Sequence, residues 1–290
     1  MNESAPFLLR PFPEWENRVR AAFTSRHLAV RDPSLPNPAA GSPPSPAGAS
    51  TGAYSDLNLG FLSGDDPERV ARNWKTVLDA EGLAEKTLVI PRMVHGDVFI
   101  DADGLTETGN VREAEGPEVG EAGLRRLEPQ GADALFSRSS RRVLAVTMAD
   151  CLTALIFDPA GGTIAAVHAG WRGTRARILE KTLRFLANSG RIRAESALVA
   201  FGPCLRPDSL EVGAEVAAGL DPEFVIGKAG RFYFDMPGCN RAQAIAAGVL
   251  VDHIRDSGGC TLTEPERYFS YRSDGQASGR LAAFISLVEP

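Results

Sequence analysis

Two side chains that commonly bind transition metals, Cys151 and His168, lie 17 positions apart in the sequence. Each adjoins a run of apolar residues, and the turn signal Pro159–Gly162 lies between them, so the two side chains can converge in space. A third candidate, His95, follows the apolar segment 88–90. Thiolate and imidazole suit zinc or copper, and three protein ligands leave a fourth position for water, as in catalytic zinc sites.

A purely structural interpretation of these residues is also open. A buried Cys is often an inert thiol, and a His at a strand end is often only hydrogen-bonded. The order His, Cys, His with these separations is not one of the short zinc signatures. Spacing alone is therefore compatible with a metal site and with ordinary core side chains.

The elements that would position these residues are short buried strands. Three runs of β-branched and small apolar residues, 143–146, 152–157 and 163–167, are separated by polar residues, Pro and Gly. Asp150 lies at the first break, directly before Cys151. Its carboxyl group is a candidate catalytic acid or base.

The segment after His168 predicts an anion site. Gly170-Trp171-Arg172-Gly173 joins the third strand to a helix predicted over Thr174–Asn188. Backbone N–H groups and the dipole at a helix start favour an anion, and Arg172 adds a forked, permanently charged donor. Gly170 and Arg172 are therefore candidates for binding a phosphate or a substrate carboxylate. The alternative is that the glycines only allow close packing and that Arg172 is a surface residue.

Three sequence motifs occur together: ADC at 149–151, HAGWRG at 168–173 and FGPC at 201–204, which is followed by LEVGAEV. Their combination resembles the YfiH family, whose members are also called laccase-domain proteins, multicopper polyphenol oxidases or peptidoglycan editing factors. The resemblance covers most of the chain, from about Phe23 to Ile285.

The resemblance implies a metal ion held by His95 of VHG, Cys151 of ADC and His168 of HAGWRG, in a single domain over residues 1–290. Family members have been assigned purine nucleoside phosphorylase, methylthioadenosine phosphorylase and adenosine deaminase activities. We therefore expect a zinc-dependent enzyme that phosphorolyses adenosine, inosine or methylthioadenosine and deaminates adenosine, with a nucleoside and phosphate as its ligands. Two alternatives are a copper-dependent, laccase-like phenol oxidase and a peptidoglycan-precursor editing factor.

Further polar residues are candidates for the site. Arg26 ends a segment that resembles the first strand of the family, and Asn58 lies where the family pattern resumes near the active site. Both are candidates for binding substrate or phosphate. Asp133 is either a catalytic carboxylate or the cap of a turn. Arg272 and Arg280 could reach the site, although a structural ion pair is the default interpretation.

Three positions depart from the family pattern. Met93 stands where the family often has Gln, Met148 where it often has Thr or Arg, and Leu210 where it more often has Tyr. These departures leave the identity of the nucleoside open.

The composition is that of a large globular domain. The chain has 290 residues, of which 43% are hydrophobic and 23% charged. A net charge of −6 and a sequence pI of about 5.4 argue against nucleic acid as a partner. Four scattered cysteines without a CxxC motif suit a reducing compartment. The sequence shows neither a signal peptide nor a membrane-length apolar run, so we expect a cytoplasmic protein that binds no membrane. We also expect a monomer.

Strand-like runs alternate with helical patterns, and hairpin signals also occur, which indicates an α/β protein with mixed sheets. Together with the resemblance, this predicts a layered α/β sandwich. Asp66-Pro67 begins a helix, Tyr268–Gly275 is expected to form a strand and turn, and Leu281–Leu287 is a closing strand. The segment 28–49, rich in Pro, Gly and Ser, is expected to be a mobile surface loop inserted into the domain.

Overall fold

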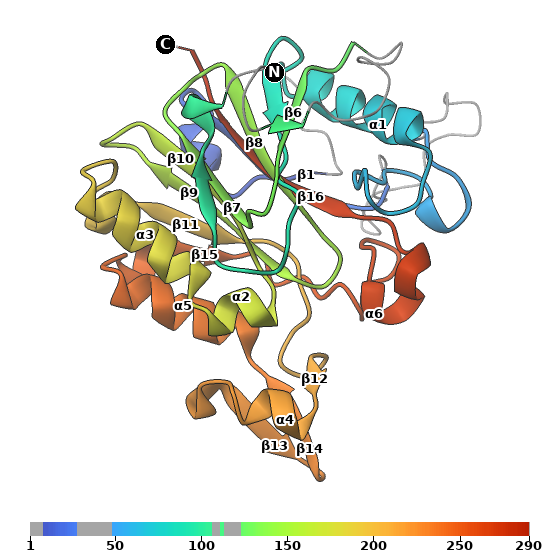
Figure 1. Ribbon diagram of the computed structural model, residues 1–290, viewed down its shortest axis with the longest axis vertical. Helices are drawn as coiled ribbons and strands as arrows, with labels where there is room; N and C mark the ends of the chain where they lie inside the picture. Colours follow the sequence, from blue (N-terminus) through green and yellow to red (C-terminus); the bar gives the residue numbers. More distant parts are fainter. Residues whose placement is uncertain (1–7, 28–47, 106–110, 113–122, 290) are drawn as a thin grey trace.

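The computed structural model describes residues 8–27, 48–105, 111–112 and 123–289. Within these ranges the strands form two large mixed sheets and one small sheet (Figure 1). The first large sheet has the order β1 (Leu8–Leu9), β2 (Val19–Thr24), β16 (Leu281–Leu287), β8 (Arg142–Met148), β3 (Thr87–Val89), β6 (Arg126–Pro129) and β5 (Val111–Arg112). The second has the order β15 (Ile254–Asp256), β11 (Leu198–Phe201), β9 (Leu152–Asp158), β10 (Thr163–Ala169), β7 (Ala134–Ser137) and β4 (Phe99–Asp101).

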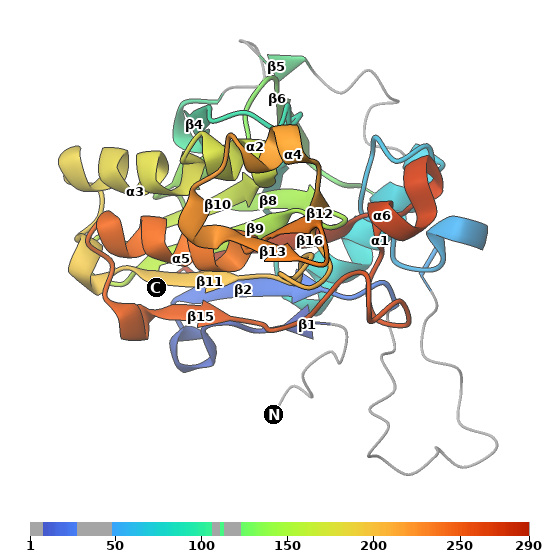
Figure 2. The same ribbon diagram turned by 90° about the horizontal axis from the view of Figure 1, so that it is seen from below.

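The two large sheets pack face to face and carry helices on their outer faces (Figure 1, Figure 2). The first sheet is covered by α1 (Pro67–Ala80), and the second by α2 (Trp171–Arg175), α3 (Ile178–Asn188) and α5 (Met236–Ala246). Each sheet contains parallel and antiparallel pairs, for example β3 with β8 and β16 with β8. The predicted layered α/β sandwich with mixed sheets is therefore confirmed.

The central strands are mainly apolar because both of their faces are buried. In β9, Ala154 and Ile156 contribute to the core under the helices, whereas Leu155 and Phe157 contribute to the core between the sheets. Successive side chains of a strand point to opposite faces, so a strand in the middle of such a sandwich needs a continuous apolar run. The three predicted strands and the closing strand are confirmed as β8, β9, β10 and β16.

Helix α1 begins where the sequence predicted. The side chain of Asp66 accepts the backbone N–H of Glu68 at 2.9 Å, and Pro67 is the first helical residue. Trp74 is fully buried and donates its ring N–H to the carbonyl of Leu59 at 2.9 Å. This bond connects the helix to the segment that precedes it.

Two predicted elements differ in the structure. The helix predicted over Thr174–Asn188 is divided into α2 and α3, and Arg177 between them has a left-handed φ of 62°. The carbonyl of Thr174, which would accept the N–H of Ile178 in a continuous helix, instead accepts the side-chain amide of Gln243 in α5 at 2.8 Å and the backbone N–H of Arg177 at 3.0 Å. The expected strand and turn over Tyr268–Gly275 contains the short helix α6 (Tyr271–Asp274) instead.

A smaller unit projects from the two large sheets (Figure 1). It consists of α4 (Ala214–Ala217) and a sheet with the order β12 (Glu211–Val212), β14 (Arg231–Phe234) and β13 (Val225–Lys228). The predicted insertion falls mostly on 28–47, which lie outside the described residues. Across the parts of the chain that the structure describes, no helix combines the length and apolar character needed to cross a bilayer.

Candidate metal centre

The three predicted metal ligands, His95, Cys151 and His168, lie together. One ligand atom from each lies within 4.8 Å of the others, and the two imidazole rings meet edge to face with centroids 4.9 Å apart. Zinc binds sulfur at about 2.3 Å and imidazole nitrogen at about 2.0–2.1 Å, so one ion can contact all three side chains. Two imidazoles and one thiolate are donors that fit zinc or copper.

The register of two neighbouring strands brings Cys151 and His168 together. The chain crosses from the first large sheet to the second between β8 and β9, and Asp150 in this crossing has a φ of 93°. β9 then pairs antiparallel with β10 and places Leu152 opposite Ala169. The convergence that the intervening turn signal predicted is present in the structure.

The buried carboxylate of Asp133 positions both histidines. Its Oδ1 lies 2.9 Å from Nδ1 of His168 and accepts the backbone N–H of His95 at 2.9 Å. Its Oδ2 accepts the N–H groups of Val94 at 3.2 Å and Gly96 at 2.8 Å. An Nδ1–H donated to the carboxylate leaves Nε2 of His168 as the nitrogen that can bind a metal. Asp133 therefore holds His95 and His168 in place through hydrogen bonds.

Electrostatic coupling favours a thiolate at this site. Burial alone would raise the pKa of the Cys151 thiol, but the rings of His168 and His95 lower it to about 6. Burial alone would lower the pKa of His168, but Cys151 and Asp133 raise it to about 9. The pKa of Asp133 is also lowered, because the hydrogen bonds from His168 and Gly96 outweigh burial. The thiolate is the form of cysteine that binds a metal.

Gly170 leaves the space that Cys151 occupies. A Cβ atom built at Gly170 would lie 2.8 Å from Sγ of Cys151 and 3.5 Å from Cδ2 of His95. The residue also precedes the five-residue helix α2. The structure therefore gives Gly170 a packing role next to the ligands, while its predicted role in phosphate binding stays a prediction.

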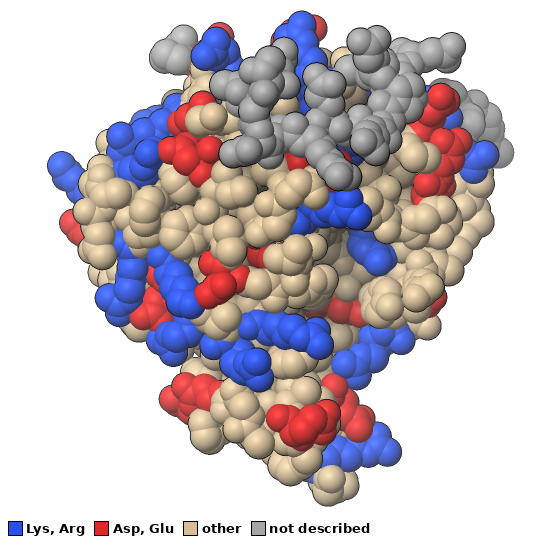
Figure 3. All heavy atoms as spheres, in the orientation of Figure 1, with Lys and Arg blue, Asp and Glu red and all other residues tan. Residues whose placement is uncertain are grey.

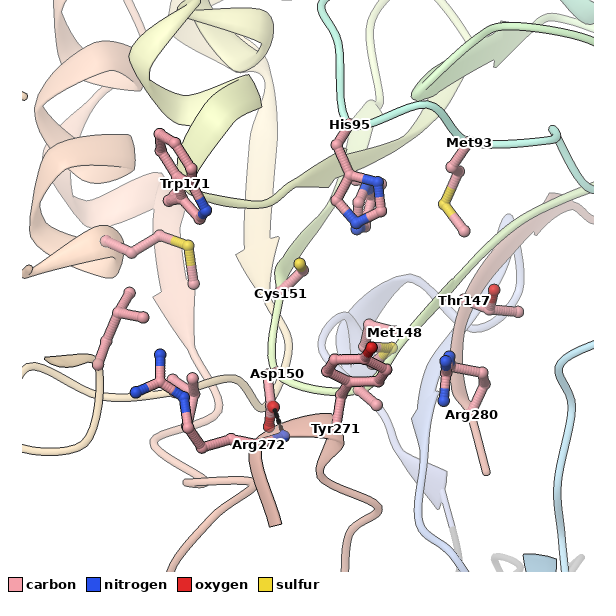
Figure 4. Close-up of a pocket in the computed structure, with 15 residues that line it drawn as sticks. Met93, His95, Thr147, Met148, Asp150, Cys151, Trp171, Tyr271, Arg272 and Arg280 are labelled. Carbon is pink, nitrogen blue, oxygen red and sulfur yellow. Dashed lines mark hydrogen bonds between the residues drawn. The ribbon is translucent and has the colours of Figure 1, made fainter. Parts of the chain in front are cut away.

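The ligands form part of the wall of a cavity of about 470 Å³ (Figure 4). Figure 4 shows the ring of Tyr271 across the cavity from His95, with Arg272 and Arg280 on either side of that ring. Every methionine after Met1 lines this cavity, and the flexible thioether side chains give it an adaptable apolar surface. The remaining lining residues are Thr147, Ala149, Asp150, Trp171, Leu205 and Leu210.

Asp150 lies in the cavity wall, but its carboxylate is occupied. Its Oδ1 accepts the hydroxyl groups of Thr261 and Ser270, each at 2.7 Å, and its Oδ2 accepts the backbone N–H of Arg272 at 2.6 Å. These bonds hold the start of α6, which carries Tyr271. Asp150 thus positions one wall of the cavity, and its predicted role as a catalytic acid or base stays a prediction.

Three predicted binding residues lie outside the cavity lining. Arg172 is exposed, and its guanidinium carbon lies 4.3 Å from the ring centroid of Trp171. Arg26 donates to the backbone carbonyl of Pro265 and lies over the ring of Phe269. Asn58 is fully buried and binds neighbouring backbone and side chains. Substrate or phosphate binding by these residues stays a prediction.

Sequence reasoning did not identify two features of the site. The role of Asp133 depends on a contact with His168, which lies 35 positions away in the sequence. In the sequence, only the carboxylate of Asp133 indicated a role in the site. Tyr271 lies in a segment with no aromatic periodicity, so no local pattern marked its ring as part of a cavity.

On the face shown in Figure 3, basic and acidic side chains are intermixed among the described residues.

Comparisons with known proteins show which family the chain belongs to. A family model described as multi-copper polyphenol oxidoreductase laccase matches residues 45–288. A Shigella flexneri protein named purine nucleoside phosphorylase YfiH is 35% identical over 248 residues, which cover 83% of this chain and 90% of that protein. A protein of an unknown prokaryotic organism, named adenosine deaminase RL5, is 32% identical over 236 residues, which cover 79% of this chain and 86% of that protein. The crystal structure of YlmD from Geobacillus stearothermophilus has a TM-score of 0.77 at 27% identity, covering 99% of this chain and 98% of that chain.

Proposed function

Because the chain belongs to the YfiH family of laccase-domain proteins, we propose that it is a zinc-dependent enzyme that acts on purine nucleosides. The reactions are phosphorolysis of adenosine, inosine or methylthioadenosine and deamination of adenosine. Relatives named purine nucleoside phosphorylase and adenosine deaminase support both reactions at the level of the family. The ligands are thus a nucleoside and phosphate, and we expect the enzyme to be monomeric.

The observation that carries the proposal is the cluster of His95, Cys151 and His168 in the wall of a cavity of about 470 Å³. This volume lies within the range of about 300–1,000 Å³ that is usual for small-molecule sites. Three protein ligands leave a position open toward the substrate. When bound, zinc acts as a Lewis acid and lowers the pKa of a coordinated water toward 7.

The residues of this chain supply binding and orientation. The ring of Tyr271 offers a flat surface on which a purine can stack, and it is exposed to 47%. Arg272 and Arg280 give the same cavity two permanent positive charges. Asp133 keeps His168 in the tautomer that leaves Nε2 free.

The two reactions make different demands on the site. In phosphorolysis, a phosphate oxygen bonds to C1′ of the ribose while the C1′–N9 bond breaks, and the released purine takes up a proton. In deamination, water adds to C6 of adenine and ammonia leaves. Phosphorolysis therefore requires a bound oxyanion next to the sugar, whereas deamination requires an activated water next to the base.

The alternative of a copper-dependent phenol oxidase rests on the description of the matching family model. Within the described residues, one group of side chains, His95, Cys151 and His168, is arranged to hold a metal ion. A multicopper oxidase combines a type 1 centre with further copper ions and needs more histidine ligands than the four in this chain. We therefore favour zinc, and elemental analysis separates the two metals.

The test combines metal analysis with a nucleoside screen on the purified full chain. We expect about one zinc per chain, purine release that depends on phosphate, and ammonia release from adenosine without phosphate. Cys151→Ala should lose zinc and both activities. Cys239→Ala is the control, because Cys239 is a buried free cysteine that lies outside the cavity lining.

Several copper ions per chain with phenol oxidation would reject the zinc proposal in favour of the alternative. Unchanged zinc content in Cys151→Ala would show that the metal binds elsewhere. Intact zinc without turnover of any purine nucleoside would reject the substrate class.

A further inference from the structure

The half-buried guanidinium of Arg280 lines the cavity without an ionic partner. Among the described residues, no carboxylate forms an ion pair with it. Its Nη1 donates to the backbone carbonyl groups of Ser278 and Gly279, while Nε and Nη2 donate to no described residue. Arg10 and Arg206, which are also partly buried, are neutralised by carboxylates. Burial lowers the pKa of Arg280, so a bound anion would offset the cost of keeping this charge in the wall.

The segment Asn58–Gly60 holds Arg280 in place. The side-chain oxygen of Asn58 accepts the backbone N–H of Arg280 at 2.8 Å, and the backbone N–H of Leu59 donates to the carbonyl of Arg280 at 2.9 Å. Asn58 is in turn fixed by the hydroxyl of Ser63 at 2.8 Å. The position of the Arg280 backbone is therefore determined by contacts on both of its polar groups.

Gly60 leaves room for the Arg280 side chain. A Cβ atom built at Gly60 would lie 2.4 Å from Cγ of Arg280 and 2.8 Å from its Cβ. Gly60 does not have a positive φ, so the absence of a side chain serves packing. The Asn58–Gly60 segment thus determines the direction in which the aliphatic part of the Arg280 side chain leaves the backbone.

The surroundings of the guanidinium suit an oxyanion. Thr147 lines the same part of the cavity, and its hydroxyl makes no hydrogen bond within the described ranges. In Figure 4 the guanidinium of Arg280 lies between Tyr271 and the strand that carries Thr147. The acidic side chain of this wall, Asp150, is already occupied by Thr261, Ser270 and a backbone N–H. An oxyanion would therefore meet free donors from Arg280 and Thr147.

We propose that Arg280, positioned by Asn58 and Gly60, binds a phosphate group at the end of the cavity lined by Thr147 and Tyr271. The planar fork of arginine matches the oxygens of phosphate, which favours this anion over a halide. The phosphate is either free inorganic phosphate or the phosphate of a nucleotide. The inference deepens the proposed function and rests on it, since it assigns the co-substrate a place separate from the predicted Arg172 site.

The test is a calorimetric titration of the zinc-loaded full chain in a buffer free of phosphate. Inorganic phosphate, adenosine monophosphate and adenosine are added in separate experiments. Arg280→Gln should raise the dissociation constant of the phosphate-bearing ligand about 10- to 100-fold, as expected for loss of charge-assisted bonds. Arg280→Lys, which keeps the charge but loses the fork, should lie between Arg280→Gln and the unchanged protein.

Arg126→Gln is the matched control. Arg126 is also a partly buried arginine that lies against an aromatic ring, that of Phe61, and burial lowers its pKa as it does that of Arg280, but it is outside the cavity lining. Its phosphate affinity should equal that of the unchanged protein. Zinc content and thermal midpoint without ligand are measured for each variant, so that a folding defect is recognised.

Gly60→Ala tests the positioning of Arg280. The added methyl group must displace the Arg280 stem, so phosphate affinity should fall while zinc content is retained. Gly227→Ala is the control, because nothing lies within 4 Å of a Cβ built there and its φ is not positive.

The outcomes separate the two proposals. Tighter binding of inorganic phosphate identifies free phosphate as the ligand, and binding of adenosine monophosphate alone identifies a nucleotide. Equal phosphate affinity in Arg280→Gln and the unchanged protein overturns the assignment, as does an equal loss in Arg126→Gln. A failure of nucleoside turnover with an intact, Arg280-dependent phosphate affinity would reject the proposed reactions but retain this site.

Discussion

Replacing Asp133 by Asn tests how the candidate metal site is held together, because the new side chain has the same shape but donates on one side. The carboxylate of Asp133 faces four donors: the N–H groups of Val94, His95 and Gly96 and the ring Nδ1 of His168. An amide can accept on one side only. Each orientation of the amide therefore breaks a different part of the arrangement.

The cost of each orientation follows from the hydrogen bonds. With the amide nitrogen toward His168, one backbone bond to His95 is lost, and the ring must give up its Nδ1 proton in order to accept there, which leaves a proton on Nε2. With the nitrogen toward Val94 and Gly96, two backbone bonds are lost. Each bond to a charged group contributes about 1.5–3 kcal/mol, so the first orientation is preferred. We expect Asp133→Asn to lower the free energy of unfolding by about 1.5–3 kcal/mol and the zinc affinity about 10- to 100-fold.

Urea-induced unfolding of the metal-free protein measures the first effect, and competition with a zinc chelator measures the second. Asp158→Asn is the matched control. Asp158 is also fully buried and accepts the N–H groups of Gly161 and Arg193 and the hydroxyl of Ser196, but none of its hydrogen bonds goes to His95, Cys151 or His168. The control should lose stability and keep its zinc affinity. Unchanged zinc affinity in Asp133→Asn would refute the reasoning, and an equal loss in both variants would point to general destabilisation.

Two further predictions concern packing. Gly170→Ala should lower the zinc content found by elemental analysis, because its Cβ would lie 2.8 Å from Sγ of Cys151, whereas Gly227→Ala, with open space around it, should keep its zinc. Trp74→Ala should lower the free energy of unfolding in urea by about 3–5 kcal/mol, because the ring is fully buried. Trp74→Phe should cost less, and a loss below about 1 kcal/mol for Trp74→Ala would contradict the assigned burial.

Much of the fold was predictable because its main signals are local. Strands β8, β9, β10 and β16 are buried on both faces, so each is mainly apolar, and turn residues and polar residues mark its ends. Helix α1 carries its own start signal in Asp66 and Pro67. Such features depend on residues that are neighbours in the sequence.

The elements that were predicted wrongly depend on contacts between residues that lie far apart in the sequence. The break between α2 and α3 involves Gln243, which bonds the carbonyl of Thr174 from 69 positions away. Helix α6 is attached to Asp150 by hydrogen bonds from Ser270 and Arg272 across 120 and 122 positions. Local propensity contains no information on such partners, and tertiary bonds override it.

The sequence by itself determined the residue types that could hold a metal and the strand ends that carry two of them, Cys151 and His168. Only the tertiary structure decided which other side chains serve the cavity. Asp133 reaches His168 across 35 positions, and Asn58 reaches Arg280 across 222. The physical reason is that a ligand's chemistry belongs to its own side chain, whereas its orientation is set by hydrogen bonds and packing from elements that meet only in the folded chain.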